Sequence, residues 1–300
     1  MRSMPARKRS LEKNNREAYL LLIPWFIGLI GFGLIPICFS LYISFSNYTL
    51  IRAPVFVGID NYVRMFQDDM FRRSLRVTFT YVFLAVPLAL LTALAIALAL
   101  VKAFKGVGML RAVFYLPSLL GGSIAIAVLW RILFAQTGLV NQILSVFGIQ
   151  GHSWIGDPRY ALYTLVLLRM WQFGSAMLIF IAGMKQIPES LYESANIEGA
   201  GYFQKLFHIT LPMLSPIILF NAIMNMISAF QDFTPAFIVS GGTGGPMSST
   251  LFYSLFLYQR AFASFQMGYA ASMAWFLLVI IASFTFILFK TSAKRVYYES

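Results

Sequence analysis

Six apolar runs, each about 20 residues or longer, constrain the fold of this chain more than any other feature. They cover residues 18–46, 77–101, 112–134, 161–184, 213–238 and 268–289. A run of this length crosses a bilayer as a helix, and continuous apolarity differs from the alternation of a membrane-spanning β-strand. With 59% hydrophobic and 11% charged residues, the 300-residue chain has too little polar surface for a soluble domain. The sequence predicts an all-α integral membrane protein whose six transmembrane helices form one domain, residues 18–290, between tails at 1–17 and 291–300.

The net charge of +12 comes mainly from basic clusters that the six spans place on one side of the membrane. The clusters are Arg2, Arg7, Lys8, Arg9, Lys13 and Arg16, then Lys102, Lys105 and Arg111, and finally Lys290, Lys294 and Arg295. Because Lys and Arg are enriched in cytoplasmic loops, we expect both termini and the 185–212 loop in the cytoplasm, and the chain in the cell (inner or plasma) membrane. The arginines of the first outer loop are an exception to this distribution. Inverting the chain would place the larger basic set outside the cell, so we keep the orientation. The charge therefore reflects membrane topology rather than nucleic acid binding.

The first outer loop contains a second pattern of charge. Asp60, Arg64, Asp68, Arg72 and Arg76 recur every four residues. That spacing lines opposite charges along one face of a single helix. We interpret it as a solvated helix that lies along the outer membrane surface.

The cytoplasmic loop at 187–212 is polar and punctuated by glycine. Pro188 suits a first helical turn, and Gly199 and Gly201 are expected to end or bend the helix that follows. A proline at 212 then restricts the residue before it, just ahead of the next span. Two to four residues would suffice to connect two spans. The loop therefore predicts a short helix across the membrane face that serves as a docking element.

The same loop resembles a known pattern. Six residues fit Glu-Ala-Ala-x3-Gly-x9-Ile-x-Leu-Pro at every spacing, with Ser194 in place of the middle alanine: Glu193, Ala195, Gly199, Ile209, Leu211 and Pro212. This resembles the loop of the inner-membrane permease subunits of binding-protein-dependent ABC importers. Further stretches resemble the MalF-type sugar permeases in particular: Phe56-Val-Gly-Ile-Asp-Asn-Tyr, Tyr115-Leu-Pro, Leu129-Trp-Arg, Phe230-Gln-Asp-Phe and Val296-Tyr-Tyr-Glu.

The resemblance implies the MetI-like fold of type I ABC importer permeases, with the loop as a cytoplasmic coupling helix seated in an ATPase subunit. Glu193 would contact the ATPase, Gly199 would permit the close turn, and the apolar residues of 203–211 would seat against the ATPase. The implied partners are a second permease subunit in a heterodimer, two ATP-binding subunits, an extracytoplasmic solute-binding protein, a sugar and the membrane lipid. Outer loops at 135–160 and 240–262 would receive the binding protein. Which sugar is carried stays open.

Two ionisable residues lie inside the predicted spans, Arg169 in the fourth and Asp232 in the fifth. Such residues face a bundle interior or an aqueous cavity, because charge in lipid is costly. On one face of the fifth span, Asn221, Asn225 and Ser228 precede Asp232, and Gln172 and Ser175 follow Arg169. These side chains suit a sugar pathway, or else they hold the helices together as a buried pair with interhelical hydrogen bonds. The resemblance favours substrate contact.

We expect no enzyme activity from the chain alone and no cofactor. The glycines at 241–245 lack the lysine of a phosphate-binding loop, so ATP hydrolysis is assigned to a partner. His152 and His208 have no further ligands at metal-binding spacing. Two alternatives remain: an ion-coupled secondary transporter, which usually carries internal repeats and broken spans, and a membrane-embedded enzyme, which would need a clustered acid/base or metal set.

Overall fold

A computed structural model describes residues 15–292 of the chain. The tails at 1–14 and 293–300 lie outside the described part, and with them most of the terminal basic residues and the motif at 296–299. Within residues 15–292, five helices are long and apolar enough to span a membrane, or six if one bent pair counts as a single span. The predicted all-α membrane class is therefore confirmed, although several of the spans are not continuous helices.

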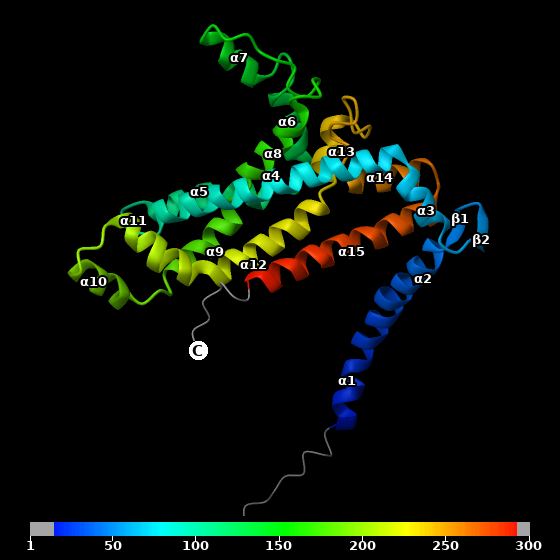
Figure 1. Cartoon of the computed structure of the whole chain (residues 1–300), viewed down its shortest axis with the longest axis horizontal. Coiled ribbons are helices and arrows are strands. Elements are labelled where there is room, and N and C mark those ends of the chain that lie inside the picture. The colour runs from blue at the N-terminus through cyan, green and yellow to red at the C-terminus, as the bar shows by residue number, and fades with distance from the viewer. Residues whose placement is uncertain (1–14, 293–300) are drawn as a thin grey trace, which may run out of the picture.

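Long helices lying side by side form the body of the protein (Figure 1). They are α4 (Asp69–Leu100), α5 (Val107–Leu120), α9 (Gly174–Met184), α12 (Leu211–Phe230) and α15 (Met267–Ser292). The buried face of α4 repeats alanine every four residues, at Ala85, Ala89, Ala93 and Ala97. Small residues at this spacing let neighbouring helices approach closely, which is how helices associate in lipid. As a result α8 (Ala161–Trp171), α9 and α12 all pack against α4.

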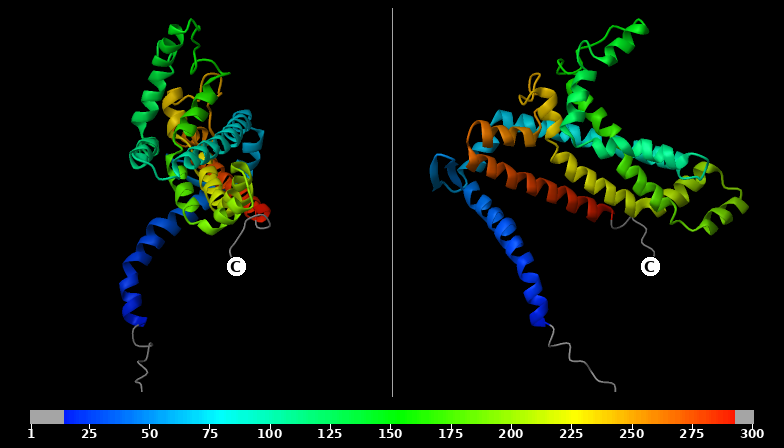
Figure 2. Two further views of the ribbon diagram at one scale, coloured as in Figure 1. Left: turned by 90° about the vertical axis from the view of Figure 1, so that its left-hand side faces the viewer. Right: turned by 180° about the vertical axis from the view of Figure 1, so that it is seen from behind.

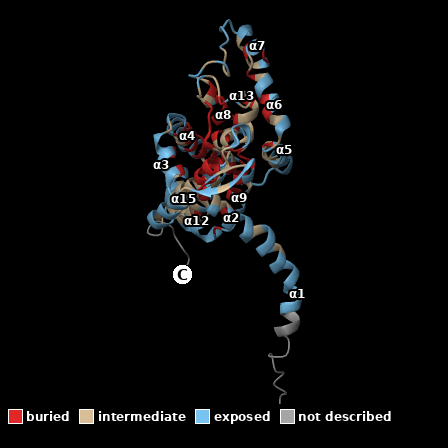
Figure 3. Cartoon of the chain, turned by 90° about the vertical axis from the view of Figure 1, so that its right-hand side faces the viewer, coloured by how far each residue is buried: buried red, intermediate tan, exposed pale blue. Residues whose placement is uncertain are grey.

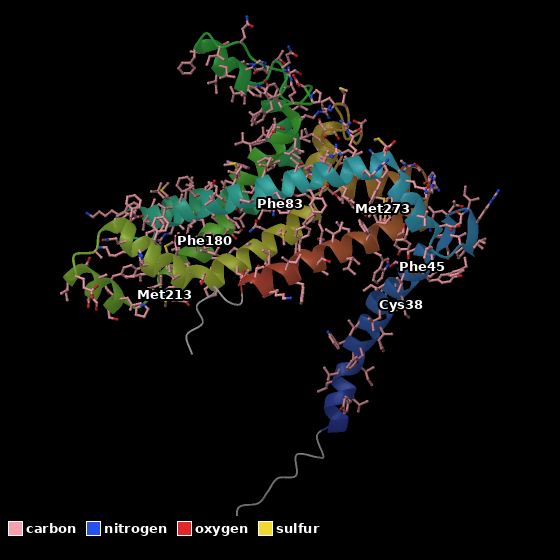
Figure 4. The ribbon with its side chains drawn as sticks, in the orientation of Figure 1. Cys38, Phe45, Phe83, Phe180, Met213 and Met273 are labelled. Carbon is pink, nitrogen blue, oxygen red and sulfur yellow. The ribbon has the colours of Figure 1, made fainter. Side chains whose placement is uncertain are left out.

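The buried residues gather between these helices and away from the ends (Figure 3). Met273 on α15 and Phe180 on α9 belong to the two main apolar clusters and are 0% and 1% exposed. By contrast Cys38 is exposed on α2, which covers Ile35–Ser44 (Figure 4). The outward surfaces of the long helices are apolar and exposed, as expected of faces that meet lipid.

The first span is helical from α1 (Asn15–Gly28) through a π-helical stretch, η2 (Leu29–Leu34), to α2 (Ile35–Ser44). Residues 15–17, which the sequence assigned to the tail, already belong to this helix. Only the end near Ser44 joins the body, where α2 packs against α15 and Ser40 accepts a hydrogen bond from Trp275 at 3.2 Å. From there the helix diverges from the other spans (Figures 1 and 2).

The segment between the first two spans, which the sequence assigned to the outer side, folds as a hairpin, β1 (Ser46–Thr49) and β2 (Arg52–Phe56), followed by α3 (Asp60–Gln67). The prediction of one solvated helix over 60–76 is wrong. Asp68 adopts an extended backbone and caps α4 by accepting from the backbone N–H groups of Met70 and Phe71. Aspartate is strongly preferred at such a cap, and it divides the charged stretch between two helices.

The third predicted span, 112–134, is broken at Gly121-Gly122-Ser123. It consists of α5 and α6 (Ile124–Leu133), which meet at 100°. Ser123 caps α6 by accepting from the backbone N–H of Ile126. The prediction of a straight helix here is therefore wrong, because a glycine pair followed by a capping serine favours a break over continuation.

Two further spans are interrupted at polar residues. The fourth consists of α8 (Ala161–Trp171) and α9, separated at Gln172–Phe173. The fifth ends at Phe230, and after residues 231–233 the chain resumes as α13 (Thr234–Ser240). The predicted fifth helix, 213–238, is thus too long, and Asp232 lies in the break rather than on the helix face that carries Asn225 and Ser228.

The outer segments flank these breaks. The short helix α7 (Leu139–Val146) projects from the body beyond α6 (Figure 2). The region 240–262 is only partly a surface loop: α14 (Tyr253–Tyr258) packs against α4, and residues 250–253 are at most 1% exposed. A π-helical stretch, η4 (Gln259–Ala263), leads on toward α15. The expectation that all of 240–262 receives a binding protein is therefore wrong for the buried part.

Candidate functional site

The loop at 187–212 forms a helical projection at one end of the body (Figure 1). It consists of α10 (Glu189–Ile197), α11 (Tyr202–Lys205) and a π-helical stretch, η3 (Leu206–Thr210), that runs into α12. A helix was predicted here, and its end lies at the predicted glycine. Gly199 has φ +75°, its N–H donates to Asn196, and the N–H of Ala200 donates to Ala195. These bonds form a Schellman motif, which requires a left-handed residue at this position.

The six residues of the loop pattern divide into two sets. Glu193 and Gly199 are exposed, whereas Ala195 and the group at 209–212 are partly buried toward the body. Large apolar side chains next to them face outward: Phe203 is 69% and Phe207 60% exposed. A surface that combines exposed aromatic rings with an acidic helix suits a protein partner better than solvent alone.

The second candidate site lies where the broken spans meet. The Nη1 atom of Arg169, at the end of α8, lies 3.3 Å from Oδ2 of Asp232, and their side chains are 12% and 17% exposed. Tyr81 on α4 donates a hydrogen bond of 2.6 Å to the same carboxylate oxygen. The guanidinium of Arg169 also donates to Asn225 and Ser228 on α12. The predicted buried pair is present, and it joins three helices around one carboxylate.

Residues at the break in the fourth span form hydrogen bonds with residues at and just before the break in the third. Gln172 donates to the carbonyl of Gly121 at 3.0 Å. Ser118 donates to the carbonyl of Gln172 and accepts from the N–H of Ser175, at 2.9 and 3.1 Å. One serine hydroxyl thus satisfies backbone groups that the interrupted helix leaves unpaired, which matters where no water is at hand.

Two cavities adjoin this polar centre. The first, of about 350 Å³, lies among α4, α9 and α12, and its polar lining is Ser118, Arg169, Gln172, Ser175, Asn221, Asn225 and Ser228. The second, of about 310 Å³, lies at the breaks and is lined by Tyr81, Gly121, Gly122, Gln231, Asp232 and Thr234, together with Arg169, Gln172 and Ser228. All six residues predicted for the pathway therefore line one cavity or both.

Sequence reasoning missed Tyr81, Ser118 and Gly121. Tyr81 and Ser118 lie within apolar runs, with no local pattern to mark them. The adjacent glycines at 121 and 122 are a detectable signal, since glycine pairs accompany kinks in helices. Within residues 15–292, no group of three or more His, Cys, Asp or Glu side chains is placed to hold a metal ion.

Membrane-spanning helices with open polar cavities between them, and a folded loop at one end, are the features of a membrane transport protein, a permease. The chain belongs to the family of inner-membrane components of binding-protein-dependent transport systems, whose sequence profile matches residues 77–297. The alternatives of a secondary transporter and a membrane enzyme are thereby set aside. Broken spans, which sequence reasoning treated as a mark of secondary transporters, occur here as well.

Curated relatives match along nearly the whole chain. The probable ABC transporter permease protein YesP of Bacillus subtilis is 51% identical over 98% of this chain and 96% of its own length. The trehalose/maltose transport system permease protein MalF of Thermococcus litoralis is 32% identical over 93% of this chain and 96% of its own length. The predicted resemblance to the MalF-type sugar permeases is confirmed.

The fold is also that of solved transporters. A chain from the crystal structure of a bacterial ABC transporter involved in the import of the acidic polysaccharide alginate matches with a TM-score of 0.78 at 22% identity. The match covers 96% of this chain and 99% of that chain. The predicted type I importer permease fold is therefore confirmed.

Proposed function

We propose that this chain is the permease subunit of an ATP-driven sugar importer and forms half of its translocation pathway. The observation that carries the proposal is the full-length similarity to a trehalose/maltose permease, together with a polar cavity inside the bundle. The cavity of about 350 Å³ lies at the lower end of the range of small-molecule sites.

The lining of the first cavity suits a saccharide. Gln172 and Asn225 bring amide groups that both donate and accept, Ser175 and Ser228 bring hydroxyl groups, and Arg169 donates only. Sugar hydroxyls need such mixed partners, while sugar C–H groups favour an aromatic surface. Phe173 and Phe220, which also line the cavity, supply aromatic rings.

Energy reaches the chain through the loop at 187–212. In this proposal α10 docks into a cytoplasmic ATPase subunit through exposed Glu193 and the rings of Phe203 and Phe207. Both termini and Lys205 then lie in the cytoplasm, in keeping with the basic clusters. A second permease subunit, two ATP-binding subunits and an extracytoplasmic solute-binding protein complete the assembly.

The test for the assembly is co-purification. The tagged chain should bring down an ATPase and a different permease in stoichiometric amounts. Recovery of the chain as a stable protein that transports without an ATPase would contradict the proposal.

The test for the pathway is uptake of the sugar that the binding protein carries, measured in proteoliposomes. Gln172→Ala and Asp232→Asn should each lower the uptake rate about fivefold or more. The first removes an amide group from the cavity lining, and the second replaces the charged acceptor of Tyr81 and Arg169 by a neutral amide. Thr80→Ala serves as control, since the Thr80 side chain is exposed, lines neither cavity and donates to the carbonyl of Arg76 on its own helix. Wild-type kinetics in both cavity variants would refute the assignment of the lining.

A further inference from the structure

The attachment of α10 to the membrane-spanning helices is unusually slight. Every residue of α10 is at least partly exposed. Toward α11 the chain continues through Gly199-Ala200-Gly201, a link whose glycines permit wide backbone movement. Bending of the link would keep a displacement of α10 from reaching the membrane-spanning helices, unless side chains also hold α10 to them.

Two side-chain bonds supply this attachment. The hydroxyl of Tyr192 lies 2.9 Å from Oγ1 of Thr210, and Nζ of Lys205 donates to Oδ1 of Asn196 at 2.7 Å. Tyr192 and Asn196 are four residues apart, so both side chains lie on one face of α10. Both bonds cross the glycine link and join α10 to the segment that becomes α12.

The bonds form one connected set. Thr210 donates its hydroxyl hydrogen to the carbonyl of Lys205 at 3.3 Å. Because a hydroxyl group has a single hydrogen, Tyr192 is then the donor to Thr210. Thr210 is 6% exposed, so its hydroxyl has little access to water as a substitute partner. Loss of the Tyr192 hydroxyl leaves the buried oxygen of Thr210 without its donor, and loss of the Thr210 hydroxyl leaves the partly buried hydroxyl of Tyr192 without its acceptor.

The position of Thr210 gives the bonds a mechanical role. Thr210 immediately precedes α12, which runs for 20 residues as a continuous helix. On α12, Asn225 and Ser228 line the cavities, and the break that follows carries Asp232. A displacement of Thr210 is therefore carried by one rigid element to the polar centre.

We propose that Tyr192 and Asn196 are positioning residues that fasten the coupling helix to α12, so that movement of the ATPase at α10 reaches the cavities through the Tyr192–Thr210 and Asn196–Lys205 bonds. The inference rests on the proposed function of the loop. The competing attachment is the backbone link from α9 through Ile187, which is 9% exposed. If that link carried the movement, the two side-chain bonds would be dispensable.

The experiment uses the complete transporter in proteoliposomes, with ATPase subunits and the sugar-loaded binding protein. Uptake and ATP hydrolysis are measured together for Tyr192→Phe, Thr210→Val and the double variant. We expect sugar imported per ATP hydrolysed to fall about fivefold or more in each single variant, because the Tyr192–Thr210 bond is lost in both. Thr210→Val also loses the bond to the carbonyl of Lys205, so the double variant should fall no further than Thr210→Val. Thr210→Ser keeps the hydroxyl and should restore the ratio.

The matched control is Tyr163→Phe, the same substitution on α8, outside the loop at 187–212 and outside the lining of both cavities. The Tyr163 side chain is 56% exposed, and its hydroxyl makes no hydrogen bond within the described residues. The ratio of this variant should equal that of the unmodified protein. An unchanged ratio in Tyr192→Phe and Thr210→Val would overturn the inference, as would loss of ATPase binding in those variants, since the residues would then act in docking. If the unmodified chain fails to bind an ATPase at all, the proposed function fails instead.

Discussion

Arg169 and Asp232 lie 63 residues apart in the chain and meet at 3.3 Å, each at the break of a different span. A helix break in lipid leaves backbone groups unpaired, and here the broken ends carry charges that pair with each other. The hydroxyl of Tyr81 adds a second donor to the carboxylate. The network therefore compensates the charges and connects the broken fourth and fifth spans to continuous α4.

Because of this pairing, removing one charge should destabilise the protein more than removing both. Asp232→Ala should lower the free energy of unfolding by about 3 kcal/mol, because Arg169 would remain partly buried without its counter-charge. Combining Asp232→Leu with Arg169→Met removes both charges and should recover much of that loss. Thermal unfolding of the purified protein in detergent measures both. A double variant less stable than Asp232→Ala would contradict the proposed role of the pair.

The close approach of Gly121 to Gln172 gives a second test. A Cβ atom at Gly121 would lie 2.4 Å from Cδ of Gln172, whereas a Cβ at Gly122 would meet nothing within 4 Å. Gly121→Ala should therefore lower stability by about 1–3 kcal/mol, as overpacking does, and Gly122→Ala should change it by less than about 0.5 kcal/mol. Equal melting temperatures for the two variants would show that the junction is looser than the structure has it.

The spans could be predicted because apolar length is a local property of the sequence, but their breaks depend on partners. Gln172 ends α8 where Ser118 and Gly121 can take up its polar groups, and these residues are more than 50 positions away in the chain. Asp232 was expected on one helix face with Asn225 and Ser228, yet it reaches the same cavities from a non-helical segment. The periodicity argument therefore placed Asp232 at the correct site, although the helix on which the argument relied ends before Asp232.

The apolar stretch at 251–256 is buried, although the sequence assigned it to a loop. It is too short to span a bilayer, so sequence reasoning assigned it to an outer loop, but its side chains are packed against α4. Apolar segments shorter than a span are often buried core or interfacial elements. By contrast the end of α10 was predictable, because a left-handed helix terminus requires glycine at one position and the sequence supplies Gly199 there.

The two adjacent aspartates before α4 should differ in their effect on stability. Asp68 caps α4 and also accepts from Arg260 at 2.8 Å and Tyr269 at 3.0 Å. Asp69 pairs only with Arg72, and both side chains are largely exposed. Asp68→Ala should cost about 2–4 kcal/mol, since a cap and a partly buried counter-charge are lost together.

The Asp69→Ala variant is the control for that measurement. Its cost should stay below about 1 kcal/mol, because exposed ion pairs and helix-end charges contribute little. Denaturation of both variants in the same detergent gives the comparison. Similar costs would mean that Asp68 belongs to a solvated charged face, as the spacing of the charges first indicated.

The coupling loop offers a comparison between two glycines only two positions apart. Gly199 has φ +75°, a conformation that is strained for β-branched residues whatever the space around them. Gly201 has φ −72° and ψ 171°, which any residue adopts, and a Cβ there would meet only Gln204 at 3.7 Å. Gly199→Val should disrupt the Schellman turn and lower sugar uptake about tenfold. Gly201→Val should leave uptake within about twofold, since valine adopts the extended backbone of this position without strain.

Uptake and recovery of the ATPase are measured side by side for both variants. Loss of both in Gly199→Val, with both retained in Gly201→Val, means that the turn geometry places α10 for docking. If both variants lose uptake equally, bulk rather than backbone conformation is the cause, because the two substitutions add the same side chain to the same exposed loop. If both retain full uptake, the left-handed turn is dispensable, and the assignment of residues 187–212 as the docking element is wrong.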